Sequence, residues 1–422
     1  MVDRIYVGRI PEVGHLALAG LGVTFPVIIL ISAFAALVGA GGAPQAAICM
    51  GKKDLKGAER ILGNCITALC ILAVVLSVFF YVVKEPLLML FGASEQTIGY
   101  ANSYLGIYLL GTISVQIALG LNTFINCQGF AKTGMKTVLI GAILNTVLDP
   151  IFIFAFGMGV QGAALATILS QAVSAVWVLK FLTGKKTKWH LRREHLRPRA
   201  KVVLPALALG ASPFIMQSTE SLITVCFNSS LQTYGGDLAV GAMTVLSSIM
   251  QFAMMPLQGL TQGAQPIVSF NYGARNPERV RRAFRVLLIA CLAYSLLLWA
   301  LVQLVPQLFA LMFTSDSELV AYASWALRIY MAATGIFGIQ IACQQTFVAL
   351  GNAKISLFLA VLRKIILLIP LIYILPRFFA DKSFAVFLAE PVADVLAVCT
   401  TATMFAVHFK KSMNALEEKP GL

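Results

Sequence analysis

Apolar stretches of about 20 residues recur along almost the whole chain, with short polar segments between them. Each stretch is long enough for a helix that crosses the hydrocarbon core of a bilayer. A β-barrel would show short segments of alternating polarity instead. The pattern therefore predicts an all-α polytopic membrane protein, with spanning helices near 15–41, 61–83, 102–125, 136–156, 163–182, 202–230, 239–263, 284–305, 323–348, 355–375 and 384–407.

Composition supports this fold class, because 59% of the 422 residues are hydrophobic and only 12% are charged, whereas soluble domains have about 25% charged residues. The net charge of +14 comes from basic residues in alternate loops. Loops rich in Lys and Arg face the cytoplasm, so the charge indicates topology and not a nucleic-acid partner. The cytoplasmic set is 52–60, 132–136, 180–201, 275–285, Lys354 and 410–419, which includes the C-terminal tail.

Two sequence blocks repeat at one offset. The segment "GGAPQAAICMGKKD" (41–54) matches "GAQPIVSFNYGARN" (263–276), and "GFAKTG" (129–134) matches "GNAKIS" (351–356), both 222 residues apart. Two blocks with the same offset indicate an internal duplication. Six helices separate the blocks, so the halves are parallel pseudo-repeats. We expect a first lobe at 1–183, a basic cytoplasmic linker at 184–201, a second lobe at 202–408 and a cytoplasmic tail at 409–422.

The offset also predicts a twelfth helix at the start of the chain. The helix at 202–230 should have a counterpart near the N-terminus, and "MVDRIYVG" (1–8) fits the outer end of such a helix. About eleven of twelve helices are then complete. We expect either that translation starts upstream or that the chain is a truncated, inactive product.

A buried acid in the first half is the main candidate for chemistry. Asp149 follows Asn145 by one helical turn, so both share a face, and it lies about 20 Å from the inner end of its helix at 1.5 Å per residue. Asp3 and Thr167 are expected at a similar depth. Oxygen ligands of this kind suit Na⁺, while two nearby acids can also share a proton. Pro150 frees the carbonyl of Thr146. A purely structural role for the carboxylate is the alternative, although acids inside membranes are usually functional.

The second half has its own polar residues. Glu220 has no obvious basic partner in the sequence and is a candidate cation-facing acid. Two neighbouring helices carry charged side chains of opposite sign: Arg363 and Lys364 on one, Glu390 and Asp394 on the other. We favour an internal ion pair among these four residues, since an unpaired charge inside the membrane would be costly. Amide and thioether side chains suit either a pocket that binds substrates of varied shape or ordinary helix packing, so they are a weaker indication of a substrate site. These residues are Gln217, Gln251, Met254, Gln340 and Gln344. Neither metal-ligand clusters nor phosphate-binding loops occur, and eight cysteines show no CxxC spacing, so we expect no cofactor.

The chain resembles the multidrug and toxic compound extrusion (MATE) transporters, in particular their bacterial DinF-like and MepA-like branch. The segments that carry the resemblance are "VDRIYVG" (2–8), "GAPQAAICMGKKD" (42–54) with its partner at 263–282, "LNTVLDPIFIF" (144–154) and "GVQGAALATILSQ" (159–171). It implies twelve helices in two lobes, no enzymatic activity, and export of cationic amphipathic compounds by a monomer in the bacterial plasma membrane, driven by H⁺ or Na⁺. The family's first-lobe cation site falls on Asp3, Asn145, Asp149 and Thr167, and the acid often found on helix 7 falls on Glu220.

Two other functions are weighed against export of cations. A flippase for lipid-linked precursors would line its cavity with basic residues. Away from the span ends the sequence has only three bases, Arg328, Arg363 and Lys364, against five acids when Asp3 of the expected first helix is counted. A membrane-embedded prenyl transferase would need paired Asp-rich motifs for Mg²⁺–diphosphate, and the sequence has none. The sequence favours cationic cargo and leaves the choice between H⁺ and Na⁺ open.

Overall fold

A computed structural model describes residues 6–10, 13–313 and 316–418 of the protein, without the side chains of residues 15 and 237. The secondary structure of these residues consists of helices joined by turns and loops. Within them nine helices are long and apolar enough to cross a membrane, and eleven spans result when each of two bent helix pairs counts as one. These spans confirm the predicted fold class. Most of the polar groups of the chain's backbone are satisfied within helices, as hydrocarbon requires.

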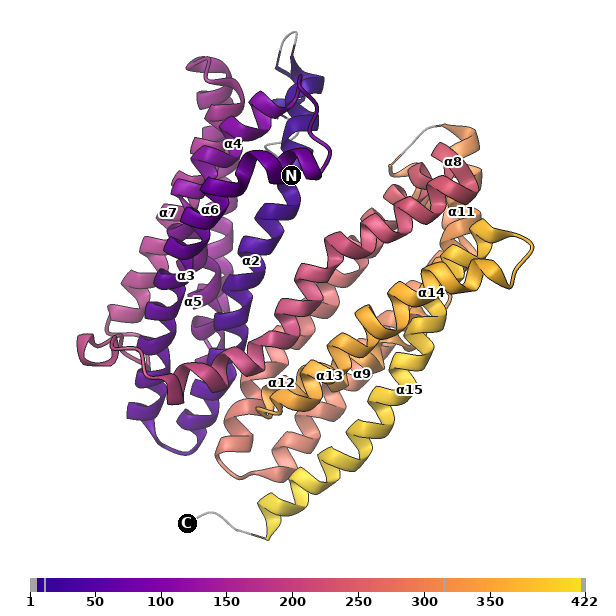
Figure 1. Cartoon of the computed structure of the whole chain (residues 1–422). Coiled ribbons are helices and arrows are strands. Elements are labelled where there is room, and N and C mark those ends of the chain that lie inside the picture. The colour runs from indigo at the N-terminus through magenta and orange to yellow at the C-terminus, as the bar shows by residue number, and fades with distance from the viewer. Residues whose placement is uncertain (1–5, 11–12, 314–315, 419–422) are drawn as a thin grey trace. The chain divides into compact units, whose positions relative to one another are not determined.

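Two compact units make up the chain (Figure 1). The first comprises the chain up to Cys49 and Asp54–Gln217, and the second comprises Met50–Lys53 and the chain from Ser218 onward. Residues 202–217, which the sequence analysis assigned to the second lobe, thus belong to the first unit.

The first unit is built from long helices and one bent pair. Its elements are α2 (Gly14–Gly51), α3 (Leu55–Leu90), α4 (Ile98–Leu110), α5 (Thr112–Cys127), α6 (Ala131–Pro150), the π-helical turn η1 (Ile151–Ala155), α7 (Gly159–Thr183), the short η2 (Arg193–His195) and the start of α8 (Ala200–Gly273). The pair α4 and α5 bends by 59° at Gly111. A buried apolar cluster that includes Leu105 and Leu109 packs α4 against its neighbours.

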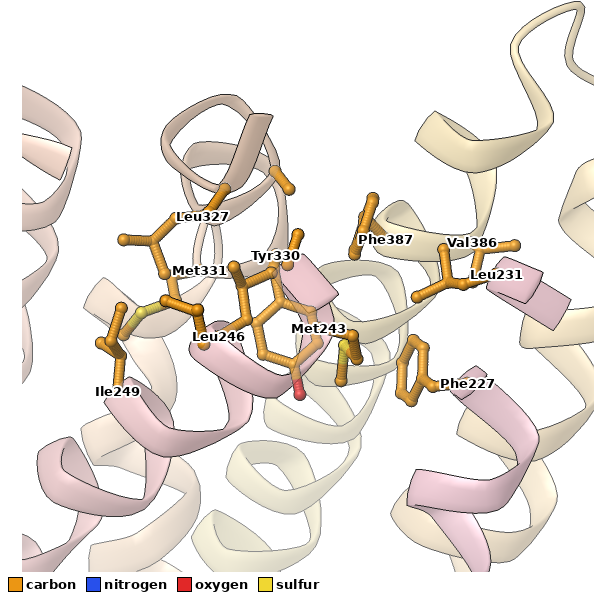
Figure 2. Close-up of a cluster of buried hydrophobic side chains, with 14 of the residues drawn as sticks. Phe227, Leu231, Met243, Leu246, Ile249, Leu327, Tyr330, Met331, Val386 and Phe387 are labelled. Carbon is orange, nitrogen blue, oxygen red and sulfur yellow. The ribbon is translucent and has the colours of Figure 1, made fainter. Parts of the chain in front are cut away.

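The second unit repeats this plan. It holds most of α8, which is interrupted at Gly236, then α9 (Pro277–Leu304), α10 (Pro306–Leu311), α11 (Ser317–Tyr330), α12 (Thr334–Ala349), α13 (Ala353–Val361), the π-helical turn η3 (Leu362–Leu368), α14 (Ile369–Ile374), η4 (Leu375–Arg377) and α15 (Lys382–Glu417). The pair α11 and α12 bends by 51°. Its main core joins α8, α11 and α15 through residues such as Phe227, Leu246 and Phe387 (Figure 2).

Backbone geometry is the same at the two repeated blocks. Lys53 and Arg275 both adopt positive φ, at 63° and 54°, two residues beyond the end of a helix. The next residue caps the following helix in each unit: Asp54 accepts from the Gly57 N–H at 2.8 Å, and Asn276 accepts from the Arg279 N–H at 3.1 Å. Side-chain caps of this kind stop one helix and start the next. The offset of 222 residues is therefore visible in turn geometry as well as in sequence.

Candidate functional site

The predicted polar cluster of the first unit lies where α6 meets α7. The Asn145 amide nitrogen is 3.1 Å from Asp149 Oδ1 and 3.4 Å from Thr167 Oγ1. Asp149 is fully buried, while Asn145 and Thr167 are half-buried. The structure thus brings together three of the four residues expected at a cation site. The fourth, Asp3, lies outside the described residues.

Pro150 explains why the backbone changes character at this cluster. Proline has no N–H for the helical ladder, and α6 ends there. A wider turn follows, in which the Phe156 N–H donates to the Ile151 carbonyl at 2.9 Å. Such π-turns occur often at functional sites. Gly157 and Gly159, with φ of 64° and 55°, then reverse the chain into α7.

Among the described residues, this cluster combines one buried carboxylate with an amide and a hydroxyl. Thr167 donates its hydroxyl proton to the Ala163 carbonyl at 3.0 Å, so its oxygen remains an acceptor. Asp149 supplies the negative charge, and an ionised carboxylate is costly to bury unless a cation, a proton or strong donors accompany it. The described residues contain no group of three or more His, Cys, Asp or Glu side chains that could hold a metal ion.

The second unit carries a network of five charged side chains. Arg363, on η3, donates from Nε to Asp394 Oδ1 at 2.7 Å and from Nη2 to Glu390 Oε1 at 3.0 Å, so one guanidinium bridges two carboxylates of α15. Its Cζ lies 4.4 Å from the centre of the Phe337 ring. These three charged side chains are almost completely buried. A buried guanidinium used in this way fixes the packing of η3 against α15.

Lys364 does not join this pair, which corrects the sequence analysis. Its ammonium lies 2.9 Å from Glu220 Oε2 on α8. The view that Glu220 has no basic partner was wrong. Successive residues of a helix point in different directions, so Arg363 faces α15 while Lys364 faces α8. Glu220 is the exposed end of the network, with 57% of its side chain accessible, against 9% for Lys364.

The other residues expected to bind substrate do not form one group. Gln340 and Gln344 are buried on α12, where the Gln340 amide nitrogen is 3.2 Å from Gln344 Oε1. Gln217 and Gln251 are exposed on α8. Met254 is half-buried beside an apolar cluster around Leu257 and Leu287. The two glutamines of α12 are thus hydrogen-bonded to each other, and their part in substrate binding stays a prediction.

The basic linker is held in place by hydrogen bonds and an ion pair that the sequence did not predict. Gln128 Oε1 accepts from the Thr187 hydroxyl at 2.8 Å and from the Lys188 N–H at 2.7 Å, and the adjacent Trp189 is fully buried. Glu59 accepts from the His190 N–H at 3.1 Å and lies 2.9 Å from Arg192 Nε. The linker is therefore a docked part of the first unit.

An apolar cavity of about 410 Å³ lies between α2 and α3, lined by residues such as Pro26, Leu30, Phe80 and Pro86. None of the candidate polar residues lines it. Its walls offer no charged group that could select a cation.

The fold and its repeated halves define a multi-span helical membrane protein, and comparisons with known proteins specify which kind. The MatE family model matches residues 1–151 and 213–374. The multidrug export protein MepA of Staphylococcus haemolyticus is 23% identical over 393 residues, with 93% of this chain and 85% of that protein covered. The FAD transporter of Shewanella oneidensis is 26% identical over 397 residues, covering 92% and 86%.

A solved structure gives the same answer. The MATE multidrug transporter DinF-BH shares 33% sequence identity and superposes with a TM-score of 0.87, with 96% of this chain and 90% of that chain covered. The chain belongs to the MatE family of membrane transporters. This confirms the resemblance found in the sequence, and it excludes the prenyl transferase alternative because the protein is a transporter and not an enzyme.

Proposed function

We propose that the protein exports cationic amphipathic compounds by alternating access in exchange for H⁺ or Na⁺. The observation that carries this proposal is the buried Asp149 beside Asn145 and Thr167. A carboxylate in this setting is costly to leave charged and uncompensated, so its occupancy by an ion is linked to the local conformation. The names of the relatives support drug export, since MepA is a multidrug export protein and DinF-BH a multidrug transporter.

The coupling step would act through the hydrogen bond between Asn145 and Asp149. When an ion neutralises Asp149, the Asn145 amide loses a charged acceptor, and charge-assisted hydrogen bonds are about twice as strong as neutral ones. The adjoining π-turn at 151–155 can absorb a change of helix geometry there. Asp3, which lies outside the described residues, is the fourth residue that we assign to this ion site. An ion that binds one conformation of the transporter better than the other shifts the equilibrium between the two conformations. If the cargo also binds the two conformations with different affinity, ion binding and cargo binding are linked.

Charge in the second unit supports a cationic cargo. Both buried basic side chains that the structure describes there, Arg363 and Lys364, are already paired with carboxylates. They are therefore not available to a phosphate, which a lipid-linked precursor would carry. Glu220 is the accessible acid, and we place it at the cargo site with Gln217, Gln251 and Met254. Gln340 and Gln344 join that site only after α12 rearranges.

The proposed topology places the linker and the C-terminus on the cytoplasmic side of the bacterial plasma membrane. Loop charges support this orientation. The side chain of His190 is 44% accessible, so a cysteine at this position can be labelled. A membrane-impermeant thiol reagent should label His190→Cys in inside-out vesicles and not in intact cells. Labelling in intact cells would refute the topology.

Efflux from proteoliposomes tests the function. Vesicles that contain the protein and a fluorescent cation such as ethidium are given a pH gradient, a Na⁺ gradient or neither. We expect cation transport against its own gradient with one of the two ion gradients and not without them. Uncoupled leakage, or coupled transport of a phosphate-bearing lipid analogue in place of the dye, would contradict the proposal.

A further inference from the structure

The charge network of the second unit does not balance. It contains three carboxylates, from Glu220, Glu390 and Asp394, but only two cations, from Arg363 and Lys364. All except Glu220 have less than a tenth of their surface exposed. With every group ionised the network would carry a net charge of −1, and because Lys364 is paired with Glu220, Arg363 is the one described cation in direct contact with the two buried acids of α15. Such a residual charge is expensive, and proteins usually remove it by protonation or by binding a cation.

The hydrogen bonds indicate where the imbalance lies. Lys364 and Glu220 form one pair. Arg363 serves one oxygen of Asp394 and one oxygen of Glu390. The second oxygen of Glu390, Oε2, is buried and has no hydrogen-bond partner among the described residues. An ionised carboxylate left half-satisfied in this way pays a full desolvation cost. The excess negative charge therefore belongs to Glu390, shared with its neighbour Asp394.

Other elements around Glu390 supply no further cation in the described part of the chain. From α11, Tyr330 contributes a buried, uncharged phenol (Figure 2). From α12, Phe337 presents an uncharged ring to Arg363. From α8, Glu220 adds a negative charge. Of these neighbours, Glu220 makes the ionised form of Glu390 less favourable, because its charge has the same sign.

We infer that the second unit holds one exchangeable proton, on Glu390 and shared with Asp394, and that a cation arriving at Glu220 releases it. Before the exchange, two cations and one proton balance three carboxylates. A cargo cation at Glu220 adds a positive charge and frees Lys364 to compensate the inner acids. The O–H bond of Glu390 then breaks, and its proton leaves to water. One positive charge enters and one leaves. Only this release step rests on the proposed cationic cargo; the presence of the proton does not.

Infrared difference spectroscopy of the purified protein at neutral pH tests for the proton. Wild type should show the absorbance of a protonated carboxyl group that is lost in Glu390→Gln. Asp394→Asn should lose the same band, because two acids then face two cations and no proton is needed. The double variant should lose no more than either single variant. The exposed Glu278→Gln is the control and should keep the band. Spectra that are unchanged in both single variants would overturn the proposal, as would loss in Glu390→Gln alone.

Proton release on cation binding tests the second step. In weakly buffered detergent, tetraphenylphosphonium should release about one proton per bound cation from wild type, by the charge balance above. Glu390→Gln and Asp394→Asn should bind the cation without this release, whereas the exposed control Glu278→Gln should keep it. Release that survives in the first two variants, or disappears only in Asp149→Asn, would place the proton in the first unit. If wild type does not bind the cation, both the cationic cargo and the release step fail, and the infrared result still decides the proton.

Discussion

The two halves of this transporter share a backbone plan but not a chemistry. In the first, the Asn145 amide contacts both the buried acid Asp149 and the Thr167 hydroxyl. In the second, three acids and two bases form an ionic network. Among the described residues, the first site thus contains one charged side chain and the second contains five. A shared backbone plan does not impose the same chemistry on both halves, because chemistry depends on the side chains placed on the fold.

The offset of 222 residues shows how completely the two sites differ. Each buried charged position of these two sites corresponds to an uncharged residue without polar side-chain groups in the other half: Asp149 to Leu371, Arg363 to Gly141, Lys364 to Ala142, Glu390 to Ile168 and Asp394 to Ala172. By contrast, the turn and cap residues are kept, as in Asp54 and Asn276. The duplication therefore preserves where helices begin and end, whereas each half has its own ionisable groups.

Both halves nevertheless place their charges beside a π-helical turn. The turn η1 begins two residues after Asp149, and η3 contains Arg363 and Lys364. The two turns occupy different positions in the repeat. In each half the helix departs from regular geometry at its charged site, which allows side chains to reach partners on other helices.

The largest loss of stability should come from Arg363→Leu, which disrupts the ionic network of the second half and leaves the Asp149 site of the first half unchanged. Removal of the guanidinium leaves two buried carboxylates without a partner, and breaking a buried ion pair costs about 3–5 kcal/mol. We expect a strong loss of folded protein, measured by thermal unfolding in detergent. Arg328→Leu, at an exposed position, is the matched control. Adding Asp394→Asn to Arg363→Leu should restore part of the stability; a double variant no more stable than the single one would show that the charges are not the cause.

A smaller effect is expected at the linker of the first half. In Gln128→Ala the Thr187 hydroxyl and the Lys188 N–H lose their common acceptor, at about 1 kcal/mol for each hydrogen bond. Residues 187–190 should then exchange amide hydrogen faster, while the helices keep their protection. Hydrogen exchange measured by mass spectrometry checks this. Exchange at the linker equal to that of wild type would mean that Trp189 alone holds it in place.

The smallest effect on stability is expected for Glu220→Gln, which separates recognition from folding. Its side chain is largely exposed, so the pair with Lys364 contributes at most about 1 kcal/mol. Binding of a cationic dye should weaken roughly tenfold, which corresponds to about 1.4 kcal/mol, while a neutral analogue of the dye should bind as before. Equal losses for the two ligands would show that Glu220 has no role in selecting charge.

Local features of the chain were predictable from its sequence. Short-range chemistry determines them: turn residues end helices, and the spacing of Asn145 and Asp149 places them on one face. The spanning helices followed from apolar length, although the prediction ended several early, such as the first at 41 where α2 continues to Gly51.

Partners that lie far apart in the sequence were not predictable. Nothing local links Lys364 to Glu220, 144 residues away, or Gln128 to Lys188. Only the packing of helices decides which of several acids a base meets. One signal was nevertheless available: Arg363 and Lys364 are consecutive, so on one helix they cannot both face the same pair of acids.

Efflux by the Asp149→Asn variant tests the central claim most directly, namely that the Asp149 site of the first half couples transport to an ion. Asparagine keeps the shape and can still hydrogen-bond Asn145, but it carries no titratable charge. In proteoliposomes with pH and Na⁺ gradients, we expect dye export to fall close to the level without a gradient, while dye binding without gradients stays near that of wild type. Export at the wild-type rate across the full range of pH and Na⁺ would contradict the account.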